Sequence, residues 1–414
     1  MMITLMAMLL TMFQGAWAND AVYFTCGSQL QPLQETDISV KKEVLTITIG
    51  EDGFAYVEVD YEFMNNGAEK TVTMGFEAQA PYNDEEPLNK KGVHPHIKDF
   101  TVSMNGSQLT YNTALIFTKN YMDEWPSELK SRKDTLAFVP VDLSRWDLQD
   151  EVPSIMVNRQ TKEEANFAYA YYFDAHFKAG LNKVRHTYRY RMSYGIGRTF
   201  SISYWLKPAM RWANHQIDDF TLRIHADNST KHFYIQCSAF DKIPFTVASG
   251  KGKTRIVDLT DDTDDEGNVL PHKATEAVIR NGVLEWHCQN FKTDEDMEIE
   301  SAEILQYRTD LDEKQFILYY DSGETFCKWG GWWMMYDELY TGPDNEQMKK
   351  AFTARLRRNL PYAHRGYVFK DPELKRIFES MWWYMPDPSW KATSTSFSRH
   401  EQELIAKSND FDVE

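Results

Sequence analysis

The amino-acid sequence predicts a mainly β protein, in which two antiparallel β-rich, sandwich-like lobes are followed by a small helical C-terminal module. Apolar and polar residues alternate with period two through much of the chain between about residues 20 and 340. Turn-forming dipeptides separate these alternating runs. After residue 345 the apolar residues recur every three or four positions, which is the period of a helix. These three observations assign the fold class.

Composition and charge narrow the class of protein. The chain has 414 residues, of which 42% are hydrophobic and 26% are charged, and its net charge is −17. The hydrophobic content is sufficient for packed cores and excludes wholesale disorder. The acidic balance argues against a general nucleic-acid binder, because such a protein needs a basic face to displace counterions from phosphates. The length predicts two or three domains of roughly 150 residues each.

Residues 1–18 have the features of a secretory signal peptide. The segment contains no charged side chain, and its apolar stretch at residues 3–13 is too short to span a bilayer of about 30 Å. It ends in Ala16-Trp17-Ala18, a small-x-small pattern. The sequence therefore predicts cleavage after Ala18 and a periplasmic or extracellular protein. No later stretch approaches eighteen apolar residues, so the chain is not predicted to span a membrane.

The sequence does not determine whether or how the four cysteines form disulfides. Export would place them in an oxidising compartment, and four thiols allow three pairings. No two of them have the CxxC spacing of a zinc knuckle or a redox site. Two disulfides and four separate buried thiols are both open. The four residues are Cys26, Cys237, Cys288 and Cys327.

The body of the protein is predicted to consist of one β-rich lobe at residues 19–200 and a second at residues 201–340. A strand over residues 57–63 illustrates the pattern, because Val57, Val59, Tyr61 and Phe63 alternate with acidic residues. Turn dipeptides tolerate the positive φ values of tight hairpins and mark the strand ends. They are Asp52-Gly53, Asn66-Gly67, Asn105-Gly106 and Asn281-Gly282. The flanks of the last pair predict a hairpin there.

Two stretches of the body resemble a known family. The first is the hairpin formed by residues 43–50 and 57–67, and the second comprises residues 203–208 and 212–224. Both are similar to a domain-of-unknown-function family of exported bacterial β proteins, and the resemblance extends over most of residues 20–320. The family brings no catalytic residues that could be assigned to this chain.

The C-terminal module is predicted at residues 341–390 and contains two helices. Met348, Phe352 and Leu356 share one face of the first helix, which we expect to end at Pro361. Asp371-Pro372 has the residue types of a helix start and predicts the second helix. The polar, Ser/Thr-rich residues 391–414 are predicted to form a flexible tail.

Residues 345–388 resemble the YARHG domain, a small extracellular module of bacterial envelope proteins. The resemblance rests on the spacing of Asn359, Tyr362, Ala363, Gly366, Phe369, Leu374, Phe378, Trp383 and Tyr384. The pentapeptide at residues 362–366 reads Tyr-Ala-His-Arg-Gly, with His and Arg exchanged relative to the family name. The resemblance implies an extracellular location and a binding or scaffolding role. We expect a positive φ at Gly366, because it lies between a helix and an extended segment.

Charge and aromatic residues suggest two binding surfaces. Residues 345–390 contain nine Lys or Arg and five Asp or Glu, a net charge of 9 − 5 = +4 on an otherwise acidic chain. The module is therefore predicted either to dock on its own body or to bind an acidic partner, such as a cell-envelope polymer or an envelope protein. Its predicted basic aromatic patch comprises Arg357, Arg358, Arg365 and Trp382. Trp332 and Trp333 form a second aromatic cluster, which is either core or a ligand platform.

The sequence supplies no motif that specifies a reaction. His94 and His96 could offer imidazoles to a metal, but Pro95 between them breaks strand geometry, and we predict neither a metal nor another cofactor. There is no Gly-x-Ser-x-Gly and no His-Glu-x-x-His. We therefore expect a non-catalytic binding or scaffolding protein for a cell-wall, polysaccharide or protein partner. The alternative is a secreted hydrolase whose site is assembled in space from the β lobes. The sequence leaves the oligomeric state open.

Overall fold

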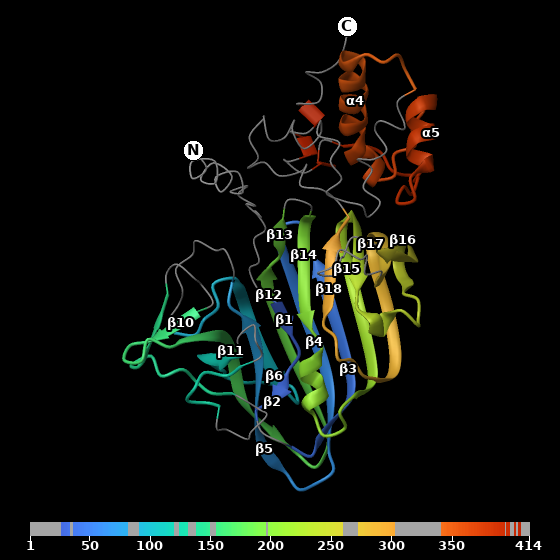
Figure 1. Ribbon diagram of the computed structural model, residues 1–414. Coiled ribbons are helices and arrows are strands. Elements are labelled where there is room, and N and C mark those ends of the chain that lie inside the picture. Colours follow the sequence, from blue (N-terminus) through green and yellow to red (C-terminus); the bar gives the residue numbers. More distant parts are fainter. Residues whose placement is uncertain are drawn as a thin grey trace, which may run out of the picture.

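In the part of the chain that it describes, the computed structural model shows a β body with two sheets, followed by two α-helices near the C-terminus (Figure 1). It describes residues 26–33, 36–81, 91–119, 124–130, 138–149, 155–195, 198–259, 272–302, 341–393, 395–397, 401–402 and 405–406. The predicted signal peptide, Trp332, Trp333 and Cys327 lie outside these residues. The predicted mainly β fold with a helical C-terminal module is confirmed.

The strands follow one another through the body in chain order. They are β1 (Cys26–Ser28), β2 (Gln31–Pro32), β3 (Ile38–Ile49), β4 (Phe54–Asn65), β5 (Lys70–Gln79), β6 (Ile97–Met104), β7 (Ser107–Gln108), β8 (Asn112–Thr118), β9 (Trp146–Leu148), β10 (Ile155–Asn158), β11 (Glu164–Phe177), β12 (Gly180–Arg191), β13 (Ser193–Gly195), β14 (Arg198–Trp205), β15 (Ile217–Gln236), β16 (Thr246–Leu259), β17 (His272–Phe291) and β18 (Met297–Ser301). Two short 3₁₀ helices lie at Lys207–Arg211 and Ser238–Phe240.

The large sheet contains strands from both predicted lobes. Its order is β1-β14-β18-β15-β3-β4-β12-β6-β7, and β17 and β16 extend it beside β15. Most neighbours are antiparallel, but β15 runs parallel to β3 and β1 runs parallel to β14. Strand pairing therefore crosses the predicted boundary at residues 200/201. Period-two alternation assigns the faces of a strand but does not identify its neighbours, which is why the sequence did not show this continuity.

The second sheet covers one face of the large sheet and closes the core. Its order is β2-β5-β11-β10-β9, with β8 beside β11. A single hydrophobic cluster includes residues from Leu30 to Ile299 and fills the space between the sheets. In β4, Val57, Val59, Tyr61 and Phe63 are buried, as the alternation predicts.

Three of the four predicted turns connect consecutive strands. Asp52-Gly53 joins β3 to β4, Asn66-Gly67 joins β4 to β5, and Asn105-Gly106 joins β6 to β7. The hairpin predicted at Asn281-Gly282 is wrong, because both residues lie inside the continuous strand β17. Asn281 does have a positive φ of 47°. The pairing of β17 with β15 is irregular beside it, so the left-handed residue accommodates a bulge, not a turn.

The C-terminal module contains α4 (Glu346–His364) and α5 (Pro372–Ser380). The Asp371 side chain accepts hydrogen bonds from the first turn of α5, as predicted. The expected end of the first helix at Pro361 is wrong, because α4 continues to His364. A proline in the last turn removes only one helical hydrogen bond, and packing of that turn compensates for the loss.

Gly366 ends α4 in the conformation that we predicted. Its φ is +81°, its N–H donates to Ala363, and the N–H of Tyr367 donates to the carbonyl of Tyr362. This pair of hydrogen bonds is the Schellman motif, which satisfies carbonyls at the end of a helix.

The structure describes the thiols of two of the four cysteines. Cys237 and Cys288 are free thiols, so they do not pair with each other. Burial raises the pKa of Cys237 to about 11.

Among the described residues, no helix has the length and hydropathy that crossing a membrane requires.

Candidate functional site

The module docks on the β15–β16–β17 part of the large sheet through a buried arginine. Arg280 of β17 is only 6% exposed. Its Nε donates to Thr230 Oγ1 at 2.9 Å and to the carbonyl of His364 at 3.2 Å, and its Nη2 donates to the carbonyl of Met385 at 2.8 Å. His364 is the last residue of α4, so the guanidinium lies where the helix dipole is negative. Figure 1 shows the module above this end of the sheet.

A second group of charges surrounds Trp382 at the same junction. The Arg255 guanidinium lies 4.4 Å from the centre of the Trp382 ring, and the Lys253 ammonium lies 5.0 Å from it. Arg255 also pairs with Glu276 at 2.6 Å, whose other oxygen is 2.8 Å from His232 Nε2. Burial opposes ionisation of Glu276, but these two partners hold its pKa below the usual range. Trp382 is thus a contact between module and body.

The described part of the tail also packs on the module. Arg365 makes a bidentate ion pair with Glu401, at 2.6 and 2.7 Å, and its guanidinium lies 5.0 Å from the ring centre of Phe397. The Phe397 ring is 4.6 Å from that of Tyr362. Two described residues of the segment predicted to be a flexible tail, Phe397 and Glu401, therefore contact the module.

The four residues of the predicted basic patch therefore have different surroundings. Arg365 contacts the tail and Trp382 contacts the body. Arg358 is half-buried on α4 and has partners of its own. Arg357 also lies on α4, and its side chain is outside the described part of the chain. Binding of an acidic partner by this patch stays a prediction, as does ligand binding by Trp332 and Trp333.

We expect Glu401→Gln to destabilise the module by about 1 kcal/mol, because a partly buried bidentate pair is stronger than an exposed one. Urea unfolding of the full chain measures the change. The matched control is Glu379→Gln, whose partner Lys375 is 3.9 Å away and exposed. Equal effects of the two substitutions would contradict the role given to the Arg365–Glu401 pair.

The His94-x-His96 pair is used inside the fold. His94 is fully buried, its Nε2 is 2.8 Å from the carbonyl of Gln79, and its Nδ1 accepts from the N–H of His96 at 3.1 Å. Burial lowers the pKa of His94 to about 3. Both ring nitrogens are engaged by the backbone, so the ring has no lone pair available for a metal.

The outward face of the large sheet carries two adjacent depressions on β3, β4, β12 and β6. Their volumes are about 300 Å³ and 390 Å³, and the second continues along the same strands where the first ends. We call their outward-facing lining the outer strip. It comprises Lys42, Val44, Thr46, Thr48, Tyr56, Glu58, Asp60, Glu62, Asp99, Ser103, Lys183, Arg185, Thr187 and Arg189.

The charges of the outer strip pair across neighbouring strands. Arg185 lies opposite Asp60 in the β12–β4 register and also bonds Glu58. Lys183 lies opposite Glu62, with 3.3 Å between their charged atoms. Arg189 bonds Asp99 of β6 at 2.7 Å. Opposite charges at facing positions stabilise an antiparallel pair, so the strip is a rigid polar surface.

Buried carboxyl groups are the feature that the sequence analysis missed. Glu43 is completely buried between the sheets, where its Oε1 accepts from Gln29 Nε2 at 2.6 Å and its Oε2 has no partner. Burial raises its pKa to about 8. Alternation in β3 could have revealed it, because Glu43 has the same parity as the buried Leu45 and Ile47.

A second carboxyl group lies on β18. Glu298 accepts hydrogen bonds from the hydroxyls of Ser201 and Ser203 on β14, and burial raises its pKa to about 7. Serine hydroxyls beside a carboxyl group are residue types that hydrolases use, and a hydrolase is the predicted alternative function. It lines neither of the two depressions.

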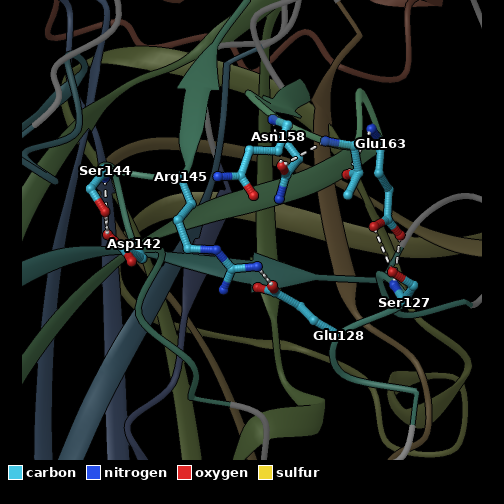
Figure 2. A network of polar contacts seen from close by, with 9 residues as sticks. Ser127, Glu128, Asp142, Ser144, Arg145, Asn158 and Glu163 are labelled. Atoms are coloured by element: carbon cyan, nitrogen blue, oxygen red, sulfur yellow. Dashed lines mark hydrogen bonds and ion pairs between the residues drawn. The ribbon is translucent and has the colours of Figure 1, made fainter.

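A network of polar contacts connects the loops around β9 and β10 (Figure 2). Glu163 accepts from both the N–H and the hydroxyl of Ser127, each at 2.6 Å, and Arg145 pairs with Glu128 at 2.8 Å. Asn158 accepts from the backbone N–H groups of the turn that follows it. All of these polar groups serve loop geometry, so we assign them a structural role.

Comparison with protein families confirms both predicted resemblances. Residues 332–412 match the YARHG domain, and residues 18–201 match a domain of unknown function (DUF4424). The second match ends before the stretches at residues 203–208 and 212–224, so the family resemblance of the body is shorter than we predicted. No curated protein matches the chain.

Solved structures show only distant similarity. A protein titled "putative nutrient binding protein" from Legionella pneumophila has 14% identity and a TM-score of 0.49, with 95% of this chain and 100% of that chain covered. The M1 zinc metallopeptidase of Deinococcus radiodurans has 8% identity and a TM-score of 0.22, with 61% and 43% covered. Baculovirus P35 has 10% identity and a TM-score of 0.23, with 64% and 98% covered. At these scores the similarities support no conclusion about this chain.

Proposed function

We propose that this chain, which carries a YARHG domain after a DUF4424 region, is an exported protein that binds or scaffolds a component of the bacterial cell envelope. The proposal rests on the shape and the charge of the two depressions on the outer strip. Both are open hollows on an exposed sheet face, and their charges already neutralise one another. Such a surface suits contact with an extended partner.

The buried titratable groups support the same proposal. A catalytic site needs acids and bases that converge on a pocket where a substrate can reach them. Glu43 and His186 are completely buried, and neither lines a described depression. Burial lowers the pKa of His186 to about 3, so its ring is neutral in the folded protein. Protonation of these groups affects the stability of the fold.

The proposed location is the periplasm or the extracellular medium, and the proposed partner is an envelope polymer or envelope protein. The predicted cleavage after Ala18 and the YARHG match support the location. Expression of the full chain in a bacterium, followed by cell fractionation, tests it. We expect soluble protein that begins at Asn19 in the exported fraction. An intact Met1 on protein recovered from the cytoplasm would contradict the proposal.

Envelope binding is tested by co-sedimentation of the exported protein with purified envelope fragments that contain cell-wall polymer and envelope proteins. We expect retention that saturates with increasing protein. The absence of saturable retention from fragments of the native host would overturn the binding proposal while leaving the location intact.

A further inference from the structure

The outer strip offers more than a generic contact surface. We infer that it binds a neutral polyhydroxylated polymer, such as an uncharged glycan chain. This inference rests on the proposed binding function and names the chemistry of its ligand. It follows from the charge balance of the strip, from its supply of hydrogen-bonding groups and from one exposed aromatic ring.

Charge balance excludes a strongly charged ligand. The two depressions are lined by four cationic and four anionic side chains, which are Lys42, Lys183, Arg185 and Arg189, and Glu58, Asp60, Glu62 and Asp99. An anionic polymer would meet four carboxylates, and a cationic polymer would meet four cations. Either would have to break the ion pairs that cross the strands, such as Arg189–Asp99. A neutral ligand leaves these pairs in place.

The same pairs leave donors and acceptors for hydroxyl groups. A carboxylate has about four lone-pair sites and a guanidinium has five N–H groups, so one ion pair uses only part of each. The hydroxyls of Thr46, Thr48 and Thr187 lie among them in the second depression. A sugar hydroxyl both donates and accepts, which matches this alternation of groups at short spacing.

Tyr56 supplies the apolar surface that a sugar ring needs. Tyr56 is 40% exposed and lines the second depression, and its hydroxyl donates to Asp52 at 2.7 Å, which fixes the ring. A held aromatic ring can pack against the C–H face of a sugar while neighbouring polar groups bind its hydroxyls. Since both depressions follow the same four strands, the strip fits a chain of several units.

Affinity electrophoresis of the full chain tests this inference. Native gels contain one of a panel of neutral soluble polysaccharides (glucans, mannans and galactans), or an anionic polymer, alginate. We expect retardation by at least one neutral polysaccharide, and the same retardation at low and high salt. Tyr56→Ala should weaken it by about ten-fold, a change of the size that loss of one aromatic contact produces.

Three variants separate the strip from other aromatic surface. Thr48→Trp fills the second depression with a side chain that is common in strands, and it should abolish retardation. Tyr56→Phe keeps the ring and should retain most of the binding. Tyr111→Ala removes an equally exposed tyrosine that lines neither depression and should bind as the wild type does.

Two results would overturn the inference and leave the proposed function standing. One is retention on envelope fragments without retardation by any neutral polysaccharide. The other is salt-sensitive retardation by alginate alone. If the wild-type protein is not retained on envelope fragments, the proposed function is overturned, whatever the result of affinity electrophoresis.

Discussion

Replacing Gly366 by alanine is expected to detach the C-terminal module from the β body. Its φ of +81° costs a non-glycine residue about 1–3 kcal/mol. A Cβ at this position would also lie 2.4 Å from Arg280 Nη1 and 2.5 Å from the carbonyl oxygen of Met385. Arg280 cannot move away cheaply, because its other nitrogens hold Thr230, His364 and Met385. The substitution therefore affects both the end of α4 and the docking contact.

Gly53→Ala is the matched control for this prediction. Gly53 has nearly the same φ, +82°, but nothing lies within 4 Å of its Cβ position. It therefore measures the conformational cost alone. Urea unfolding and hydrogen exchange of the full chain provide the comparison. We expect Gly366→Ala to lower the free energy of unfolding more than Gly53→Ala does, and to speed exchange in α4. Equal losses from the two substitutions would show that the contact with Arg280 does not hold the module.

The sequence was sufficient for features that depend on neighbours along the chain. Alternation placed Val57 and Phe63 in the core, and the Asp371-Pro372 pair located the start of α5. The sequence was insufficient where one local pattern is compatible with two backbone geometries. The positive φ that Asn281 tolerates fits a hairpin or a bulge, and only the pairing of β17 with both β15 and β16 decides between them.

The candidate sites depended on contacts between distant segments, which one sequence does not reveal. Arg365 and Trp382 both belong to the predicted basic aromatic patch, whose binding of a ligand stays a prediction. Their partners, Glu401 and Arg255, lie 36 residues after the first and 127 residues before the second. The outer strip was equally hidden, because its polar residues resemble any solvated sheet face until strand order brings β12 between β4 and β6.

The second large effect that we expect is a fall in stability as the pH rises towards 8, caused by Glu43. Its carboxyl group has a folded-state pKa of about 8, against 4.5 for an exposed glutamic acid. The folded state therefore binds more protons than the unfolded state between these values, so the free energy of unfolding decreases with increasing pH. Each pKa unit corresponds to ~1.4 kcal/mol, and the whole shift amounts to several kcal/mol.

Other buried groups also make the free energy of unfolding depend on pH, but mainly below pH 7. The effect of Glu43 is therefore best measured between pH 7 and pH 8. Burial lowers the pKa of His94 and His186 to about 3, from 6.5, so their contribution is present above pH 6.5 and is lost as the pH falls below it. Glu298 acts in the same direction as Glu43, but only up to its folded-state pKa of about 7. Above pH 7, Glu43 is therefore expected to dominate the slope.

Glu43→Gln should remove this pH dependence and stabilise the protein at pH 8. The amide is nearly isosteric with the carboxyl group, cannot ionise, and can donate to Gln29 Oε1, a buried atom that lacks a partner. Urea unfolding at pH 7, 7.5 and 8 compares wild type with Glu43→Gln, and Glu51→Gln controls for removal of an exposed carboxylate. We expect the wild type and the control to lose about 1 kcal/mol between pH 7 and pH 8, because the carboxyl group with a pKa of about 8 is half ionised at the end of this interval. The Glu43→Gln profile should be nearly flat, and three parallel profiles would show that Glu43 is already ionised in the folded protein.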